Sequence, residues 1–318
     1  MTKSAKSLLE PSIGTYANSI SKYFFATRPA FLLATIAACL LGLASARLGG
    51  VILNDVYAIV TVALALLVHA AVNVLNDYFD ALSGTDALNT ARVYPFTGGS
   101  RFIQNSLFTP QQTAQFGYGL LFLAMLGGLW LVAEAGAGLL LIGGVGVFLG
   151  WAYSAPPLSL NSRGLGELCV WMGFLGLVIG ADFVQRGSFS WQPVFVGFSY
   201  ALLVTNLLFI NQFPDCNADD LAGKRHWVVR LSPATAVRIY PILVLFAFAW
   251  SVVMVYLQKL PAITLLAALP LLLALRATLL LQQHYAEPEK LRPAIQLTLL
   301  AMLSHAFLLT LLLFWNTK

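Results

Sequence analysis

Two clusters of acidic and amide side chains interrupt a chain that is 59% hydrophobic and only 10% charged. The first lies in the segment NVLNDYFD and consists of Asn73, Asn76, Asp77 and Asp80. The second lies in the segment NQFPDCNADDLAGKR and consists of Asn211, Asp215, Asp219, Asp220, Lys224 and Arg225. Each cluster stands at the end of an apolar run, where neighbouring carboxylates repel one another unless cations hold them together. The pattern therefore indicates a cation-binding site.

The spacing within each cluster is helical. The four residues of the first cluster stand at positions i, i+3, i+4 and i+7, which places them on one stripe of an α-helix. In the second cluster, Asn211, Asp215 and Asp219 follow one another at intervals of four. A single charge at membrane depth costs roughly 3 kcal/mol on insertion scales, so several together require a partner.

The residue types favour magnesium as that partner. Carboxylate and amide oxygens without adjacent Cys or His suit a hard cation, and Mg²⁺ is usually held by one or two carboxylates together with substrate phosphates. Two such clusters suggest two ions that bridge a diphosphate. Cationic side chains that can neutralise phosphate oxygens stand nearby, namely Arg28, Arg101, Arg163, Lys224 and Arg225. The alternative is that these are ordinary charges of a solvated rim.

The composition predicts an all-α integral membrane protein with nine transmembrane helices, since about 20 apolar residues are needed to cross the bilayer as a helix. The apolar runs cover residues 28–46, 56–74, 116–133, 137–153, 167–185, 193–210, 237–257, 262–281 and 294–314. Only short interruptions separate them, so we expect one domain over residues 1–318, with residues 1–27 as an N-terminal cytoplasmic segment. That segment shows no ordered features of a removable signal peptide.

The distribution of Lys and Arg predicts the orientation, because cytoplasmic flanks hold the excess. With the N-terminus inside, fourteen of the eighteen Lys and Arg residues lie on the cytoplasmic side. The four on the other side are Arg47, Arg186, Lys259 and Lys318. Both clusters then face the cytoplasm, and a bacterial inner membrane is the expected location. The net charge of +5 is accounted for by membrane lipid or an anionic substrate, so no nucleic acid is expected.

The cysteines and histidines show no metal-binding pattern. Cys39, Cys169 and Cys216 lack any CxxC spacing, and we interpret them as packing residues. His305 lies within an apolar run, where a hydrogen bond between helices is the ordinary explanation. His69 lies one helical turn before Asn73 and could share its face.

Three segments resemble the signatures of the UbiA superfamily of intramembrane prenyltransferases. They are NxxNDxxDxxxGxD at residues 73–86, YSAPPLSLNSRGLGE at residues 153–167 and DxxxDxxAGKR at residues 215–225. The resemblance spans nearly the whole chain. The first segment and its continuation PFTGGSRFIQ at residues 95–104 are most similar to the MenA branch, which prenylates 1,4-dihydroxy-2-naphthoate in menaquinone synthesis.

The resemblance implies nine helices around a central cavity with a cytoplasmic cap, and Mg²⁺-dependent transfer of a polyprenyl group from its diphosphate to an aromatic acceptor. It implies metal ligation by Asp77, Asp80, Asp215 and Asp219, assisted by Asn73 and Asn211. It implies that Arg163, Lys224 and Arg225 stabilise the leaving diphosphate, and that Tyr153 and apolar helices shield an allylic carbocation. Further substrate contacts are expected from Arg28, Asn76 and Arg101.

Several alternatives remain at this point. The acceptor could instead be a hydroxybenzoate, homogentisate, haem or a chlorin, and an ion-coupled transporter is a different class of function. Tyr153 with the two prolines after it could be an ordinary helix end, and Arg28 with Pro29 an ordinary helix start. Asp182 and His226 depart from the family pattern and have no assigned role, and the sequence does not define the length of the prenyl chain.

Overall fold

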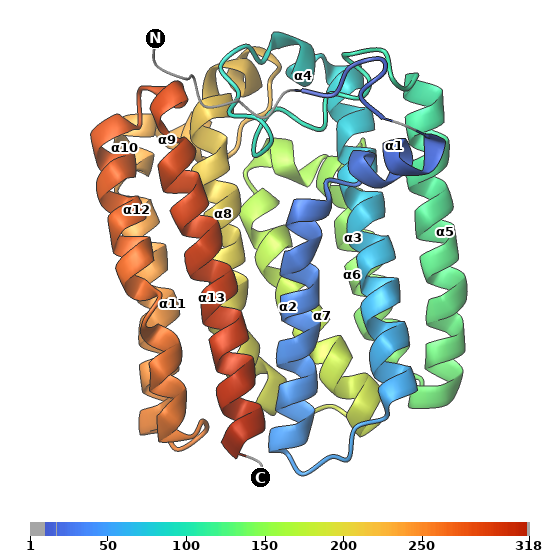
Figure 1. The fold of residues 1–318 in the computed structure, drawn as a ribbon, viewed down its shortest axis with the longest axis vertical. Helices are drawn as coiled ribbons and strands as arrows, with labels where there is room; N and C mark the ends of the chain where they lie inside the picture. Colours follow the sequence, from blue (N-terminus) through green and yellow to red (C-terminus); the bar gives the residue numbers. More distant parts are fainter. Residues whose placement is uncertain (1–9, 17, 317–318) are drawn as a thin grey trace.

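The computed structural model describes residues 10–16 and 18–316, and every regular element within these residues is a helix (Figure 1). The long helices are α2 (Pro29–Leu48), α3 (Asp55–Ser83), α5 (Pro110–Ala135), α6 (Gly138–Ser154), α7 (Gly166–Arg186), α8 (Gln192–Leu221), α11 (Ile239–Tyr256), α12 (Leu271–His284) and α13 (Arg292–Asn316). They run roughly parallel to one another and form the body of the molecule (Figure 1). The prediction of an all-α membrane protein is confirmed at this level.

The number of spans agrees only in part with the prediction. In the described part of the chain, eight helical stretches are long and apolar enough to cross a bilayer. Two of these combine neighbouring elements: α10 (Pro233–Ala236) continues into α11, and the 3₁₀ segment η2 (Ala262–Ala268) leads into α12. The one expected span that is not among these eight is residues 137–153, which correspond to α6. This helix has 17 residues and is about 26 Å long, slightly less than the hydrocarbon thickness. Nine crossings therefore stay a prediction.

The helices that carry the two clusters are longer than the apolar runs suggested. α3 has 29 residues and α8 has 30, so each is about 45 Å long and extends beyond a 30 Å hydrocarbon layer. Hydropathy detects only the apolar part of such a helix, which is why the expected ends at residues 74 and 210 were too early. The polar extensions place both clusters at one end of the molecule.

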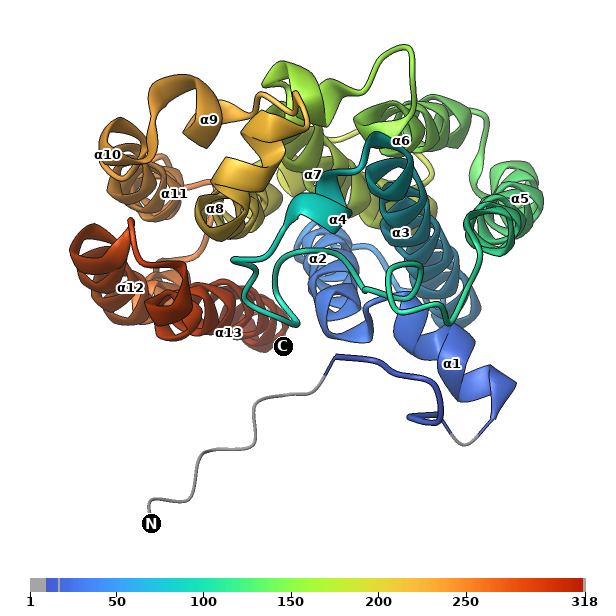
Figure 2. The same cartoon turned by 90° about the horizontal axis from the view of Figure 1, so that it is seen from above.

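The short elements gather at this same end (Figure 1). They are α1 (Ser19–Ala26), α4 (Thr85–Leu88), η1 (Leu160–Arg163), α9 (Trp227–Leu231) and η3 (Pro288–Lys290). Viewed from above, α4 and the loop that follows it pass over the space between α2, α3 and α8 (Figure 2). We call this group of elements the cap. Of the predicted segment 1–27, the first nine residues and residue 17 lie outside the described residues.

Small residues allow the central helices to approach closely. A Cβ added to Gly42 of α2 would lie 2.5 Å from the backbone oxygen of Val178 in α7. Without a hydrophobic driving force between helices in lipid, such close packing is a main source of helix association. α8 is the most buried of the membrane spans, with 78% of its apolar window inside the protein. α2, α7 and α8 therefore form a closely packed centre, and α8 carries the second cluster.

Candidate active site

A cavity of about 310 Å³ lies beneath the cap and is lined by residues of α2, α3, α6, α7 and α8. Polar side chains line its upper part, among them Arg28, Asn73, Asn76, Asp80, Asp86, Asn89, Tyr153, Asn211, Gln212, Asp215, Asp219, Lys224 and His226. The lower wall is mostly apolar and includes Phe31, Val68, Leu149, Phe174, Leu177, Val204 and Leu207. Such a cavity fits an amphipathic ligand with an anionic head and an apolar tail.

The end of α3 presents Asp80 to the cavity. The amide nitrogen of Asn76 donates to Oδ2 of Asp80 over 2.9 Å and also lies 3.0 Å from the hydroxyl of Ser154 in α6. These bonds orient the carboxylate before any ligand arrives. Asp80 and Asn76 are one helical turn apart, so the predicted stripe places them on the same face.

Asp77, which the sequence placed with Asp80 on this stripe, lies differently. It is buried, it does not line the cavity, and it forms an ion pair with Arg28. The backbone N–H of Ser100 lies 3.3 Å from both of its oxygens. Burial lowers the pKa of Arg28, while the charges of Asp86 and Asp80 act in the opposite direction. In this arrangement Asp77 fixes Arg28 at the edge of the cavity.

Asp86 is a cavity residue to which the sequence analysis assigned no role. It lies in α4, it is buried, and its Oδ2 would be 2.6 Å from a Cβ added to Gly99. Gly99 has φ of +75°, a conformation in which glycine is not strained. Burial and the charge of Asp80 raise the pKa of Asp86 to about 7. Asp86 belongs to the motif quoted above, but the stripe pattern missed it because the chain leaves α3 at Gly84.

The end of α8 supplies the second pair of carboxylates, Asp215 and Asp219. Asn89, from the loop after α4, donates its amide N–H to Oδ1 of Asp215 over 2.6 Å. Nδ1 of His226 accepts a hydrogen bond from the backbone N–H of Val229, so the proton of the neutral ring is on Nε2. Nε2 then donates a hydrogen bond to Oδ2 of Asp219 over 3.0 Å. Asn89 and His226 thus orient these two carboxylates from the cap. No helical spacing in the sequence would have identified either residue.

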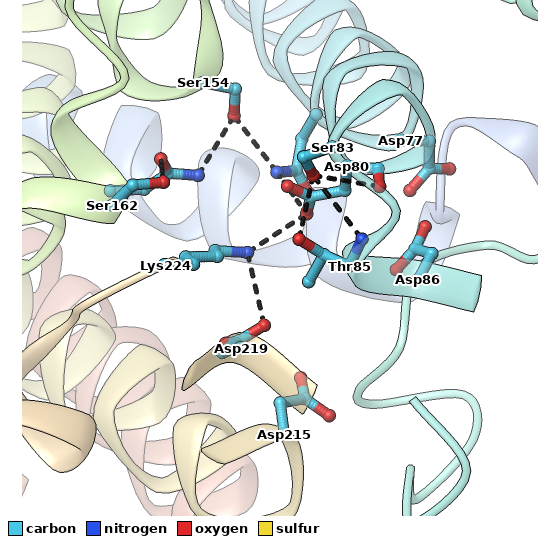
Figure 3. Close-up of polar contacts among 12 residues, drawn as sticks. Asp77, Asp80, Ser83, Thr85, Asp86, Ser154, Ser162, Asp215, Asp219 and Lys224 are labelled. Atoms are coloured by element: carbon cyan, nitrogen blue, oxygen red, sulfur yellow. Dashed lines mark hydrogen bonds and ion pairs between the residues drawn. The ribbon is translucent and has the colours of Figure 1, made fainter. Parts of the chain in front are cut away.

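Lys224 connects the two sides of the site (Figure 3). Its Nζ lies 3.1 Å from Oδ2 of Asp80 and 3.9 Å from Oδ1 of Asp219. Burial lowers the pKa of Lys224, but the charges of Asp219 and Asp80 outweigh this effect and raise the pKa overall. In Figure 3 the carboxylates of Asp86, Asp215 and Asp219 surround the space beside this ammonium group. The two predicted clusters therefore meet across one cavity.

The remaining predicted residues divide into two groups. Asn73, Asn211 and Tyr153 line the cavity, and Asn73 donates to the carbonyl of Thr27 over 3.0 Å. By contrast, Arg163 and Arg225 are exposed, Arg101 donates to the backbone carbonyl of Asp86, and none of the three lines the cavity. Asp182, at the far end of α7, pairs with Arg186 and accepts a hydrogen bond from Ser45, which accounts for it as a structural residue.

The donor set of the cavity fits Mg²⁺. Its acidic and amide oxygens include those of Asn76, Asp80, Asp86, Asn211, Asp215 and Asp219. The buried oxygen Oδ1 of Asn211 has no hydrogen-bond partner, and neither has Oδ1 of Asn89. Among the described residues, no three His, Cys, Asp or Glu side chains converge on one point. This arrangement suits ions held by one or two carboxylates and completed by phosphate oxygens.

The structure is thus a bundle of apolar helices with one cavity, whose upper part carries oxygen donors and cations and whose lower wall is mostly apolar. The model of the UbiA prenyltransferase family matches residues 57–302. The chain therefore belongs to the UbiA prenyltransferase family, and it is a prenyltransferase.

Curated relatives place the chain within the family. It is 30% identical over 244 residues to 2-carboxy-1,4-naphthoquinone phytyltransferase of Synechocystis sp., covering 74% of each chain. It is 28% identical to 1,4-dihydroxy-2-naphthoate octaprenyltransferase of Mycobacterium leprae, covering 76% of this chain and 78% of that protein. The Escherichia coli protein of the same name is 29% identical, with coverage of 69% and 71%.

Solved structures show the same fold. A UbiA homologue from Archaeoglobus fulgidus, solved with DMAPP and Mg²⁺, has a TM-score of 0.64 at 15% identity and covers 91% of this chain and 99% of its own. A structure described for digeranylgeranylglyceryl phosphate synthase has a TM-score of 0.59 at 18% identity, with coverage of 90% and 98%. This chain thus has the same overall fold as these two proteins.

Proposed function

We propose that this protein transfers a polyprenyl group from its diphosphate to 1,4-dihydroxy-2-naphthoate in menaquinone biosynthesis, with Mg²⁺ as cofactor. The observation that carries the proposal is the single cavity in which Asp80 and Asp86 face Asp215 and Asp219 above an apolar chamber. The named relatives support the acceptor, since three of them act on naphthoate or naphthoquinone acids. The homologue bound to DMAPP and Mg²⁺ supports the donor and the metal.

Two Mg²⁺ ions are proposed, one at each carboxylate pair. Asp80 and Asp86, with Asn76, would hold the first; Asp215 and Asp219, with Asn211, would hold the second. When bound, the ions supply positive charge that stabilises the diphosphate as a leaving group. Asn89 and His226 keep the second pair of carboxylates in place, as the hydrogen bonds above indicate.

The chain's own cations assist departure of the diphosphate. Lys224 lies between the two pairs and donates charged hydrogen bonds to phosphate oxygens in the proposed complex, as Arg28 does from the opposite edge. Arg163 and Arg225 are exposed, so their predicted contact with the diphosphate would require the cap to close. Asn73, Asp77 and Arg101 then act mainly by positioning the cap and Arg28.

The lower chamber suits the prenyl chain and the reactive carbon. Cleavage of the allylic C–O bond leaves a cation that water would capture, and the apolar wall excludes water. The face of Tyr153, at the upper edge of this wall, stabilises positive charge through its π electrons. The aromatic acceptor forms the new C–C bond, and its carboxyl group leaves as carbon dioxide.

We further propose that the cap faces the cytoplasm of a bacterial inner membrane. The excess of Lys and Arg at that end supports this orientation. The chain is proposed to act as one domain over residues 1–318, with membrane lipid around its apolar surface.

The proposed reaction is tested by incubating purified protein with Mg²⁺, a series of prenyl diphosphates and a panel of aromatic acceptors, with products identified by mass spectrometry. We expect a prenylated 1,4-naphthalenediol that has lost the carboxyl group, together with the naphthoquinone that air oxidation forms from it. Efficient prenylation of 4-hydroxybenzoate or homogentisate, with 1,4-dihydroxy-2-naphthoate untouched, would contradict the acceptor assignment but leave the family assignment intact.

A further inference from the structure

One polar pair stands in the otherwise apolar lower part of the cavity. Thr35 of α2 and His69 of α3 both line the cavity, and Oγ1 of Thr35 shares a hydrogen bond of 2.7 Å with Nδ1 of His69. Their neighbours on the wall include Phe31, Val68 and Phe174. Burying polar groups in such surroundings is unfavourable unless each finds a partner.

The pair leaves one group without a partner. An imidazole ring has two nitrogens, and each needs its own hydrogen bond when water is excluded. Nε2 of His69 makes no hydrogen bond to any described residue, whereas Nδ1 is held by Thr35. Thr35 is fully buried, whereas His69 is only partly buried and lines the cavity. The ring is thus oriented by Thr35 with its second nitrogen available to a ligand.

We infer that Nε2 of His69 binds the 4-hydroxyl group of the aromatic acceptor and sets the orientation of its ring, an inference that rests on the proposed function. A prenyl chain has no polar atom that could satisfy this nitrogen, so the aromatic substrate is the ligand that fits. The acceptor needs its carboxyl-bearing carbon toward the donor, and the 4-hydroxyl lies on another side of the ring.

The position of His69 agrees with this assignment. Along α3 it lies seven residues from Asn76, or about 10 Å below the level at which the diphosphate is proposed to bind. That distance leaves room for one bicyclic ring between the diphosphate and His69. Phe174 of α7 packs edge-on against His69, with ring centroids 5.7 Å apart, and gives this part of the wall an aromatic surface.

The test replaces His69 by Leu and measures steady-state kinetics with two acceptors. With 1,4-dihydroxy-2-naphthoate we expect the acceptor KM to rise about tenfold or more, the usual value of one well-placed hydrogen bond, while the KM for the prenyl diphosphate changes little. With 1-hydroxy-2-naphthoate, which lacks the 4-hydroxyl, H69L and the wild type should have the same acceptor KM. Thr35→Val, which removes the partner of Nδ1, should shift the acceptor KM in the same direction, and Thr35→Ser should not.

His305 provides the matched control. It is also a buried histidine within a span, but its nitrogens pair with Ser199 and the carbonyl of Ala267, and it does not line the cavity. His305→Leu should leave the acceptor KM unchanged even if it lowers the melting temperature. Calorimetric titration of the acceptor into H69L without donor or Mg²⁺ supplies a readout independent of turnover.

The possible outcomes separate the two claims. If the wild type turns over 1,4-dihydroxy-2-naphthoate and H69L keeps the same acceptor KM, the inference is wrong and the proposed function stands. If H69L weakens both acceptors equally, the effect is structural and the inference is again wrong. If the wild type does not use 1,4-dihydroxy-2-naphthoate at all, the proposed function fails, and with it the acceptor assigned to His69.

Discussion

Replacing Lys224 by Met removes a cation that contacts both carboxylate pairs. Its Nζ lies 3.1 Å from Asp80 and 3.9 Å from Asp219, and its side chain is only 16% exposed. Loss of one preorganised charged donor to a leaving group typically lowers kcat by about 10²–10³, or about 3 kcal/mol of transition-state stabilisation. Because Arg28 still lines the cavity, we expect K224M to lie near the lower end, at about a hundredfold.

The assay is initial-rate kinetics in detergent or nanodiscs at saturating Mg²⁺ and acceptor. Lys290→Met is the matched control, because Lys290 lies on the same end of the molecule, pairs with Glu287 and is 52% exposed. Lys224→Arg retains the charge and should recover part of the activity. A K224M variant that is correctly folded and has the kcat of the wild type would refute the proposed role of Lys224.

Three further predictions concern pH, packing and topology. Burial and the charge of Asp80 raise the pKa of Asp86 to about 7, so binding of Mg²⁺ to this carboxylate must release its proton. The Mg²⁺ affinity measured by calorimetry should therefore rise from pH 6 to pH 8. The absence of such a rise in the wild type, or an equal rise in Asp86→Asn, would contradict this prediction. Gly42→Val should lower the melting temperature by several degrees, because the new Cβ meets the backbone of α7. Gly143→Val is the control and should leave the melting temperature unchanged, because no atom lies within 4 Å of a Cβ at that position. Equal melting temperatures of the two variants would contradict the packing argument. Cysteines introduced near Lys224 should be labelled only from the cytoplasm and those near Gln258 only from outside, and labelling of the Lys224 loop from outside would exclude the orientation.

The sequence was most informative where spacing and physical chemistry agree. Asp80, Asp215 and Asp219 were selected by helical spacing and by the cost of placing charges next to apolar runs, and Lys224 was selected as a cation beside the second cluster. The structure brings all four to one cavity. Helical stripes are local features, so they are readable from one segment. The same holds for the apolar runs, which located the long helices although not the ends of α3 and α8.

The parts that sequence reasoning missed depend on tertiary contacts. Asp77 lies on the same stripe of α3 as Asp80, but its carboxylate pairs with Arg28, which directly precedes α2. Asp86, Asn89 and His226 reach the cavity only through the fold of the cap, after the chain has left α3 and α8. His226 departs from the family pattern, and its hydrogen bond to Asp219 is a tertiary contact that explains the histidine at this position.

The central claim is that carboxylates from α3 and α8 hold one diphosphate together through Mg²⁺. The most direct measurement is equilibrium binding of an unreactive prenyl thiolodiphosphate to the wild type, Asp80→Asn and Asp215→Asn, with Mg²⁺ and with excess EDTA. We expect tight binding only for the wild type with Mg²⁺, because each substitution removes one half of the same site. Binding of wild-type strength in either variant, or in EDTA, would contradict the account.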